Sequence, residues 1–495
     1  MQPFLTAFRA HPRLWLGALL LAAALALRAA TFGNPNLGVD EQFYLLVGER
    51  MHAGALPYVD VWDRKPLGLF ALYWLFGFSP WPVVSYQLVA CLAAAATAWV
   101  IALIARPSAG WQGAVLGALA YLLLLGPFDG MGGQAPVFYN LLVAGAAALM
   151  LAADADLRAG RQAWRAEAAM ALCGLAIAIK PTALFESGFF GLWGLWALGR
   201  GGLSAPALAA TALRWAALGA APFVLPGLWY AAHGHGGAWW QAMVLSMLHK
   251  QPRPPEQLRF LAMVLAMRGA LVAGLAAWGL WRWRGGGRRL AFGGLWLAAA
   301  VAGLLSLFTF FAHYALPLLV PLCVAAAHAL GRDAGGRAWG GRIGFAALAL
   351  YAGLWFNAFD FAGNRQARAD MDQLAALTRQ RAGGGRLLVY DGPSYLYALT
   401  GQPFVSPLVF PTHLNLALEA NVSQFDTARE LDRVLAGAPG VVVMALSPRN
   451  QPANAYAAAR VAAYVAQHCA PPTVMTLHEG TSQYAIGVYG PCRGR

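Results

Sequence analysis

The chain has 495 residues, of which 59% are hydrophobic and only 11% are charged. Soluble domains usually carry about 25% charged residues, so this composition excludes a soluble globular enzyme and a disordered chain and indicates a polytopic membrane protein. The net charge of +14 would suggest nucleic-acid binding in a soluble protein. Most of the basic residues flank apolar runs, however, which favours membrane topology, contact with membrane lipids and no nucleic-acid partner.

The apolar runs predict a helical bundle, because about 20 apolar residues are needed to cross a bilayer as helix. We expect about 11 to 13 spans in residues 1–362. The run at 67–79 is too short to span alone, so it lies flat or extends the second span. The eleven predicted spans lie near residues 14–30, 81–105, 111–127, 134–153, 167–180, 182–198, 209–231, 259–281, 289–311, 314–330 and 343–360.

The loops between these spans differ in charge, and the more basic set is expected in the cytoplasm. The N-terminus is then cytoplasmic, and an odd number of spans puts the C-terminal residues outside. The first apolar run lacks a small-residue cleavage site, so it is interpreted as an uncleaved span. Frequent Ala, Gly and Arg indicate a GC-rich bacterial genome, hence a multi-pass protein of the bacterial inner membrane. The basic set is Arg9, Arg13, Arg106, Arg158, Arg161, Arg165, Arg200, Arg282, Arg284, Arg288, Arg289, Arg332, Arg337 and Arg342.

Residues 363–495 are predicted to form a small periplasmic α/β domain. The segments "RLLVYDG", "GVVVMAL" and "QYAIGVY" have the pattern of strands, and 426–437 and 454–467 that of amphipathic helices. Strands that alternate with helices are typical of an α/β fold.

Two of the five cysteines lie in this polar part of the chain. Cys469 and Cys492 flank a hairpin predicted from strands at 473–478 and 483–488, whose ends would bring the two sulfurs together. An oxidising compartment permits a disulfide there. The alternative is a pair of free thiols.

The first outer loop, residues 31–80, carries the densest set of polar side chains. Its stretch from Asn34 to Gly68 predicts a helix that begins near Asp40 and is stopped by Gly54. Asp40 and Tyr44 are four residues apart and share one face of that helix. Asp40 could also be a simple N-cap, since Asp is a favoured cap residue.

This loop resembles that of the GT-C superfamily of integral-membrane glycosyltransferases, and especially the bacterial aminoarabinose-transferase and protein O-mannosyltransferase group. The pattern is Asp-Glu-x-x-Tyr, then Gly-x-x-Pro-Tyr-x-Asp, then Lys-Pro. The order of first span, acidic outer loop, many spans and outer C-terminal domain is also similar. The matching residues are Asp40, Glu41, Tyr44, Gly54, Pro57, Tyr58, Asp60, Asp63, Lys65 and Pro66.

The resemblance implies transfer of a hexose or pentose from a polyprenyl-phosphate sugar to an acceptor hydroxyl, with inversion, at the outer face of the inner membrane. Asp40, with Glu41, would be catalytic, Asp40 as general base or as the residue that orients the acceptor. Cations would stabilise the leaving phosphate; Lys65, Lys180, Lys250, Arg253 and His313 are predicted for that role. The expected substrate contacts are Tyr44, Tyr58, Asp60, Asp63, Asp129 and Tyr314.

Simpler interpretations stand beside these roles. The lysines could snorkel toward lipid headgroups, and His313 with Tyr314 could be an interfacial pair. Loop 232–258, which holds His233, His235 and His249, lacks zinc-site spacing; it is expected to order over substrate. No cofactor is predicted, and a divalent metal is not supported by the sequence.

One departure from related enzymes concerns a second acid near the start of the fourth span. Gln134 and Asn140 occupy that region here, and the nearest acid is Asp129, so either Asp129 substitutes or the second acid is absent. Two other functions stay open: a transporter or flippase of lipid-linked glycans, and a non-catalytic envelope assembly protein. For an enzyme, the acceptor could be lipopolysaccharide or another glycolipid, a polysaccharide or a protein.

Overall fold

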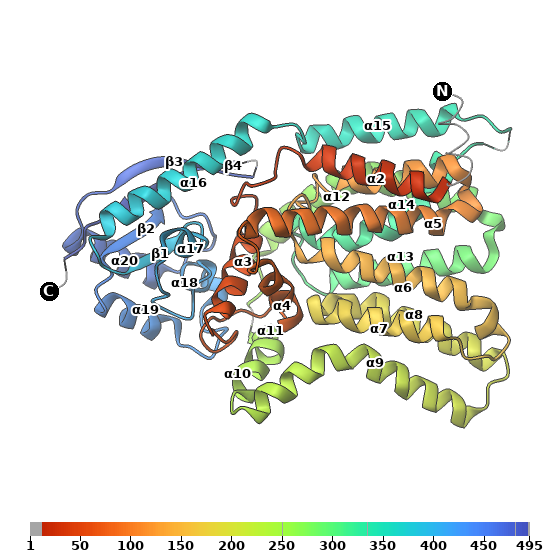
Figure 1. Ribbon diagram of the computed structural model, residues 1–495, viewed down its shortest axis with the longest axis horizontal. Helices are drawn as coiled ribbons and strands as arrows, with labels where there is room; N and C mark the ends of the chain where they lie inside the picture. Colours follow the sequence, from red (N-terminus) through yellow and green to blue (C-terminus); the bar gives the residue numbers. More distant parts are fainter. Residues whose placement is uncertain (1–11, 250, 334, 481, 494–495) are drawn as a thin grey trace. The chain divides into compact units, whose positions relative to one another are not determined.

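The computed structural model describes residues 12–249, 251–333, 335–480 and 482–493 (Figure 1). These residues form two compact units, each built from separate stretches of the chain. The helical unit comprises Met1–Ala30, Gln87–Val224 and Pro254–Phe359. The mixed unit comprises Thr31–Tyr86, Leu225–Arg253 and Asp360–Arg495. The first outer loop and the C-terminal residues therefore belong to the same unit.

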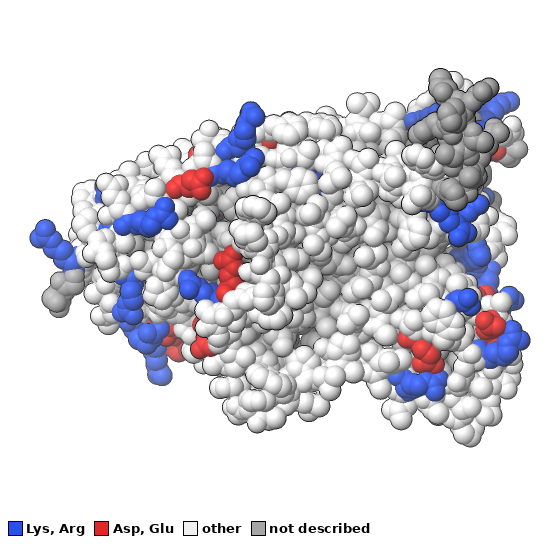
Figure 2. All heavy atoms as spheres, in the orientation of Figure 1, with Lys and Arg blue, Asp and Glu red and all other residues white. Residues whose placement is uncertain are grey.

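The helical unit contains most of the long apolar helices. Among the described residues, six helices are long and apolar enough to cross a membrane: α5 (Pro82–Leu124), α6 (Ala135–Arg158), α9 (Ala205–Ala232), α12 (Pro255–Arg282), α13 (Gly287–Leu305) and the run Ala312–Leu330, made of η4 (Ala312–Leu318) and α14 (Leu319–Leu330). On the face drawn in Figure 2, the middle of this unit is almost free of charge, and charged side chains gather at its helix ends. The predicted class, a helical multi-pass membrane protein, is confirmed.

The predicted spans map onto these helices with two differences. α5 contains two predicted spans, because the chain breaks its helical geometry only at Gly110, where φ is 69°. Four other predicted spans are shorter helices of 16 or 17 residues, α2 (Pro12–Arg28), α7 (Trp164–Ile179), α8 (Leu184–Arg200) and α15 (Trp339–Trp355). The count of about eleven spans stays a prediction.

Small residues bring the helices of this unit close together. A Cβ atom added to Gly279 of α12 would lie 2.0 Å from the carbonyl oxygen of Ala325 in α14. Only glycine permits that approach, which is typical of helix packing in membranes.

The mixed unit holds a four-stranded sheet of order β1-β2-β4-β3. β1 and β2 are parallel, with Leu387 opposite Val441, and β4 is antiparallel to both β2 and β3. The four strands are β1 (Leu387–Asp391), β2 (Val441–Ala445), β3 (Thr473–Glu479) and β4 (Ser482–Tyr489). The predicted strands and the predicted helices α19 (Thr427–Ala436) and α20 (Ala455–His468) are confirmed.

Both faces of this sheet are covered, which explains the continuous apolar runs of β1 and β2. Leu388 and Val442 pack in one core with Leu431 of α19 and Val461 of α20. α16 (Phe361–Ala382) packs against the sheet as well. The sequence analysis did not predict α16.

The remaining helices of the mixed unit are short. Residues 232–258, predicted as a loop, are largely helical, because α10 (Gly236–Trp240), η2 (Gln241–Leu245) and α11 (Ser246–His249) follow one another. The run at 67–79 forms the separate helix α4 (Leu67–Phe76). The others are α3 (Val39–His52), α17 (Leu396–Thr400), α18 (Thr412–Asn415) and η5 (Ala417–Glu419).

The predicted bridge between Cys469 and Cys492 is present. It joins the end of α20 to the residues that follow β4, as expected from the β3–β4 hairpin. Cys91, Cys173 and Cys323 are buried free thiols.

Loss of this disulfide is expected to lower the stability of the folded protein and to leave its activity nearly unchanged. The bridge has a sequence separation of 23 residues, and the chain-entropy model gives roughly 3 kcal/mol for such a loop. Cys469→Ser should therefore unfold at a lower temperature, while activity at low temperature stays near that of the wild type. Reduction of the wild type is the matched control and should give a similar shift. Equal unfolding temperatures in all three samples would contradict a stabilising role.

Candidate functional site

Asp40 lies in the first turn of α3, in the mixed unit. The helix is capped by the extended residue Gly38 without a side-chain hydrogen bond, so Asp40 is the second helical residue. The interpretation of Asp40 as an N-cap is therefore wrong, because the chain turns into the helix two residues earlier. Gly54 follows the end of the helix with φ of 87°, as predicted. A carboxylate in this first turn is stabilised by the helix dipole.

Lys65 lies beside two carboxylates of the same unit. Its Nζ is 4.0 Å from Oδ1 of Asp40 and 3.5 Å from Oδ1 of Asp63. The same Nζ is 5.3 Å from the centre of the Tyr44 ring. The side chains of Asp40 and Lys65 keep 16% and 23% of their exposure, so this group is shielded from water but still accessible. The structure thus brings together four predicted site residues, with Asp40, Asp63 and Tyr44 around the Lys65 cation.

The turn before Lys65 is held by hydrogen bonds between its own side chains and its backbone. Tyr58, fully buried and with a positive φ of 70°, donates from its hydroxyl to the carbonyl of Lys65 over 2.8 Å. Burial raises the pKa of Tyr58 well above its usual value, so it is a neutral donor. Asp60 is exposed and accepts a hydrogen bond from the backbone of Leu56. This hydrogen bond stabilises the turn between Leu56 and Asp60.

Residues from the C-terminal part of the mixed unit brace this turn. The guanidinium of Arg64 pairs with the Glu419 carboxylate. The backbone nitrogen of Trp62 donates to the Pro407 carbonyl over 2.9 Å, and Gln424 donates to the Tyr58 carbonyl over 2.6 Å. The turn that carries Lys65 is therefore positioned by side chains about 350 residues away in sequence.

The start of α3 is braced in the same way. Gln42 donates to the side-chain oxygen of Asn36 over 2.6 Å, and Asn36 donates to the carbonyl of His478 in β3. Glu41, the second predicted catalytic acid, is 2% exposed. Its burial next to the N-terminal turn favours a supporting role for this side chain.

His413 of α18 is a buried histidine that contacts Trp62, in the turn before Lys65. Its ring meets that of Trp62 edge to face at 4.6 Å, and its Nδ1 has no hydrogen-bond partner among the described residues. Burial, with the charges of Arg64 and Lys65, holds the pKa of His413 well below its usual value of 6.5. The ring is therefore neutral in the folded chain.

Because His413 is buried in its neutral form, we expect the folded protein to be less stable in acid. The unfolded chain binds a proton at His413 below about pH 6.5 and the folded chain does not, so the free energy of unfolding falls as the pH falls through that value. His413→Phe keeps an aromatic ring and removes the titration. Its unfolding temperature should fall less than that of the wild type between about pH 7 and pH 5. Parallel pH profiles would contradict the assignment.

The helical unit holds a second group of predicted residues. Lys180 follows α7 in extended conformation, and its Nζ lies 4.3 Å from the centre of the Tyr314 ring. The His313 ring meets the Tyr314 ring edge to face at 4.4 Å. The structure thus brings these three predicted residues together.

Asp129, in the turn between α5 and α6, is 56% exposed and lies 3.4 Å from Nη1 of Arg268. The same turn is held by Arg28, which is 2% exposed and donates to the carbonyls of Gly130, Met131 and Gly132. Asn140, in α6, is buried and donates to the Leu316 carbonyl.

Two predicted cations remain. Lys250 lies outside the described residues. Arg253 is half-buried in the segment of the mixed unit that follows α11. Within the part of the chain that the structure describes, no group of three His, Cys, Asp or Glu could hold a metal ion.

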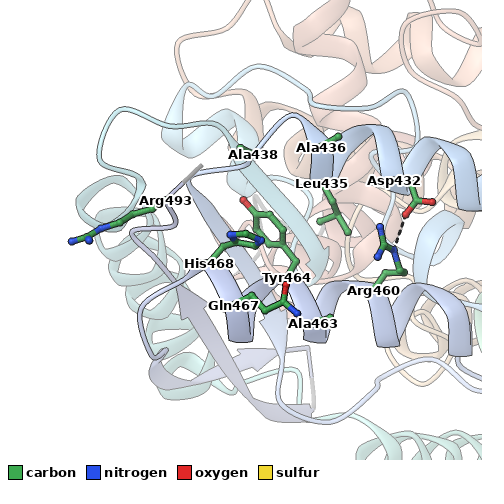
Figure 3. Close-up of a pocket in the computed structure, with 10 residues that line it drawn as sticks. All are labelled: Asp432, Leu435, Ala436, Ala438, Arg460, Ala463, Tyr464, Gln467, His468 and Arg493. Carbon is green, nitrogen blue, oxygen red and sulfur yellow. Dashed lines mark hydrogen bonds and ion pairs between the residues drawn. The ribbon is translucent and has the colours of Figure 1, made fainter. Parts of the chain in front are cut away.

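A groove of about 390 Å³ lies between α19 and α20, apart from every predicted site residue (Figure 3). Asp432 pairs with Arg460 at one end of the groove over 2.8 Å, and Tyr464 and His468 lie at the other. We assign it no role in the chemistry.

The sequence analysis missed Arg28, Arg64, His413 and Glu419. A sequence signal existed for two of them, since Arg28 ends the first apolar run and Arg64 lies beside Lys65. His413 and Glu419 carry no comparable local pattern.

The fold and these side chains define a helical multi-pass membrane protein with a small mixed-sheet region. The same fold occurs in ArnT from Cupriavidus metallidurans bound to undecaprenyl phosphate, with 16% identity, a TM-score of 0.61, and coverage of 95% of this chain and 97% of that one. The apo state of ArnT matches with 15% identity, a TM-score of 0.59, and coverage of 96% and 97%.

A more distant likeness is to the apo oligosaccharyltransferase of Archaeoglobus fulgidus, with 11% identity, a TM-score of 0.51, and coverage of 88% of this chain and 70% of that one. No protein-family model matches the sequence, and no curated protein matches it. The expected resemblance in fold is confirmed over nearly the whole chain.

Proposed function

We propose that this protein is a glycosyltransferase that moves a sugar from a polyprenyl-phosphate donor to an acceptor hydroxyl. The observation that carries the proposal is the ion-pair group of Asp40, Lys65 and Asp63, in a chain whose fold matches ArnT over 95% of its length. That ArnT structure holds undecaprenyl phosphate, which supports a lipid-phosphate donor here.

Asp40 is the proposed general base, because its carboxylate is accessible while that of Glu41 is buried. It takes the proton of the acceptor hydroxyl as that oxygen attacks the anomeric carbon. The bond from the anomeric carbon to the phosphate oxygen breaks on the opposite face, so the configuration inverts. The polyprenyl phosphate leaves with the electron pair.

The cations serve the leaving phosphate in this proposal. Lys65 in the mixed unit and Lys180 in the helical unit, with His313, carry donors suited to a phosphate on a flexible lipid. Lys65 is also the nearest counter-charge given by the structure for the proposed base, since its Nζ lies 4.0 Å from Oδ1 of Asp40. Tyr44 and Tyr314 provide aromatic faces beside the two lysines.

The proposed topology puts the N-terminus in the cytoplasm and the C-terminal residues in the periplasm. Single cysteines introduced at Ser79 and Ala420 should react with an impermeant maleimide in intact spheroplasts, and one at Arg284 should react only after lysis. Labelling at position 284 from outside would invert the orientation and remove the periplasmic site.

The acidic residues argue against a lipid-linked glycan transporter, the second candidate. Such transporters often place charged groups near mid-membrane in two repeated halves, whereas the acidic group here lies in one loop. A non-catalytic assembly protein has no evident need for that group. The acceptor classes are a glycolipid such as lipopolysaccharide, a polysaccharide or a protein, and the sugar is a hexose or pentose.

Binding of undecaprenyl phosphate tests the donor class. The lipid should raise the unfolding temperature of the purified full chain, because a ligand that binds only the folded state stabilises it. Undecaprenol has the same chain without the phosphate and should give a much smaller shift. Equal shifts from the two lipids would contradict recognition of the phosphate.

A further inference from the structure

A cationic pocket lies in the helical unit, between α6, α8 and α13. Its volume is about 360 Å³, and its charged lining residues are Asp154 and Arg158 of α6 and Arg288 and Arg289 of α13. Three guanidinium groups and one carboxylate thus line the pocket. None of these residues belongs to the proposed transferase site.

The one carboxylate is shared by two of the cations. Asp154 accepts from Nε of Arg288 over 2.7 Å and pairs with Nε of Arg158 over 3.2 Å. Nη2 of Arg288 is buried and has no hydrogen-bond partner among the described residues. Arg289 is exposed and forms no ion pair with the described residues. The pocket therefore keeps donors and positive charge for an additional anion.

Apolar and aromatic surface adjoins these cations. The Arg288 guanidinium lies 4.3 Å from the ring centre of Trp193 and 4.5 Å from that of Trp196, both in α8. Trp196 is 51% exposed and Leu192, one turn before it, is 71% exposed. Tryptophan at the end of an apolar helix is typical of the membrane–water interface. Figure 2 shows charged side chains gathered over the ends of these helices.

We propose that this pocket binds the headgroup of an anionic phospholipid. Arginine suits a phosphodiester because its planar guanidinium donates two parallel hydrogen bonds, and basic pockets between membrane helices bind such headgroups. The exposed side chains of Leu192 and Trp196 provide the apolar surface for the acyl chains. The site is independent of the proposed transfer reaction. All three of its arginines belong to the basic loops expected in the cytoplasm, so the lipid is one of the inner leaflet.

Thermal unfolding of the full-length protein in detergent tests the proposal. Phosphatidylglycerol is expected to raise the unfolding temperature in a saturable way, and zwitterionic phosphatidylcholine much less. Arg289→Gln removes one charge from the pocket and should weaken the apparent affinity for phosphatidylglycerol roughly fivefold. Arg200→Gln, an exposed arginine of the same predicted loop set outside the pocket, is the matched control and should bind like the wild type.

Asp154→Asn is a second test variant, and it is expected to change the affinity for phosphatidylglycerol in the opposite direction. It removes the competing carboxylate, so phosphatidylglycerol should bind more tightly than to the wild type. Equal shifts with the two lipids, or equal phosphatidylglycerol affinity in Arg289→Gln and the wild type, would overturn the proposal. An equal shift from inorganic phosphate at the same concentration would assign the pocket to a free anion and overturn it as well.

Discussion

Asp40→Asn is expected to lower the rate of sugar transfer by about 10²–10⁴-fold, the usual contribution of a general base. The amide has nearly the same size as the carboxylate but accepts no proton from the acceptor hydroxyl. Gly38, rather than Asp40, caps α3, so the variant should fold normally. The measurement is the rate of transfer by purified protein at saturating donor and acceptor.

The matched control is Asp372→Asn, the same change at an exposed position of α16. Its rate should equal that of the wild type. Wild-type turnover by Asp40→Asn would end the assignment of Asp40 as base, whereas loss of folding in Asp40→Asn alone would give this residue a structural role.

Lys65→Ala is expected to be the second most damaging change, with a loss of roughly 10²-fold in kcat/KM for the polyprenyl-phosphate sugar. The substitution removes the cation that lies 4.0 Å from Asp40 and 3.5 Å from Asp63. The leaving phosphate loses a positive partner, and the two carboxylates lose their shared counter-charge. Initial rates with each substrate varied in turn separate the donor from the acceptor.

Lys65→Arg keeps the charge and should recover part of the lost rate. Lys180→Ala should also weaken use of the donor more than binding of the acceptor. Arg429→Ala, at an exposed position of α19, is the control for loss of a cation and should leave both unchanged. Unchanged donor kinetics in both lysine variants would contradict the phosphate-binding role. The alternative, in which Lys65 and Lys180 contact lipid headgroups, would then hold.

The central strands of the mixed unit were predictable, because β1 and the first three residues of β2 are buried. Leu387–Tyr390 and Val441–Ala445 are therefore continuous apolar runs. α16 was not predicted, because its apolar residues do not form a continuous run. It buries Ala367, Met371, Leu374 and Thr378 along one side, but arginine and aspartate dominate the rest of the helix and mask that spacing. The break of α5 at Gly110 was predicted as a loop between two spans, and it occupies a single residue of non-helical geometry.

The candidate site was predictable only where it is local in sequence. Asp40, Tyr44, Asp63 and Lys65 lie within one loop, and the structure brings them together. The alternative interpretation of Asp40 as an N-cap is wrong, because extended Gly38 occupies the N-cap position of α3.

The residues that hold the site in place come from the C-terminal part of the chain. Glu419 and His413 reach the Lys65 turn from more than 300 residues away. A contact of that kind depends on the tertiary fold and leaves no spacing in the sequence. The same holds for Arg28, whose role appears only with the carbonyls that it binds.

The central claim is tested most directly in proteoliposomes that contain the purified chain and undecaprenyl-phosphate sugars. Mass spectrometry of the lipid fraction measures release of free undecaprenyl phosphate after an acceptor extract is added. We expect acceptor-dependent release with the wild type and with Asp372→Asn, and a rate lower by at least about 10²-fold with Asp40→Asn. Movement of the intact lipid-linked sugar across the bilayer without release of undecaprenyl phosphate, equal in all three proteins, would contradict the transferase and indicate a transporter.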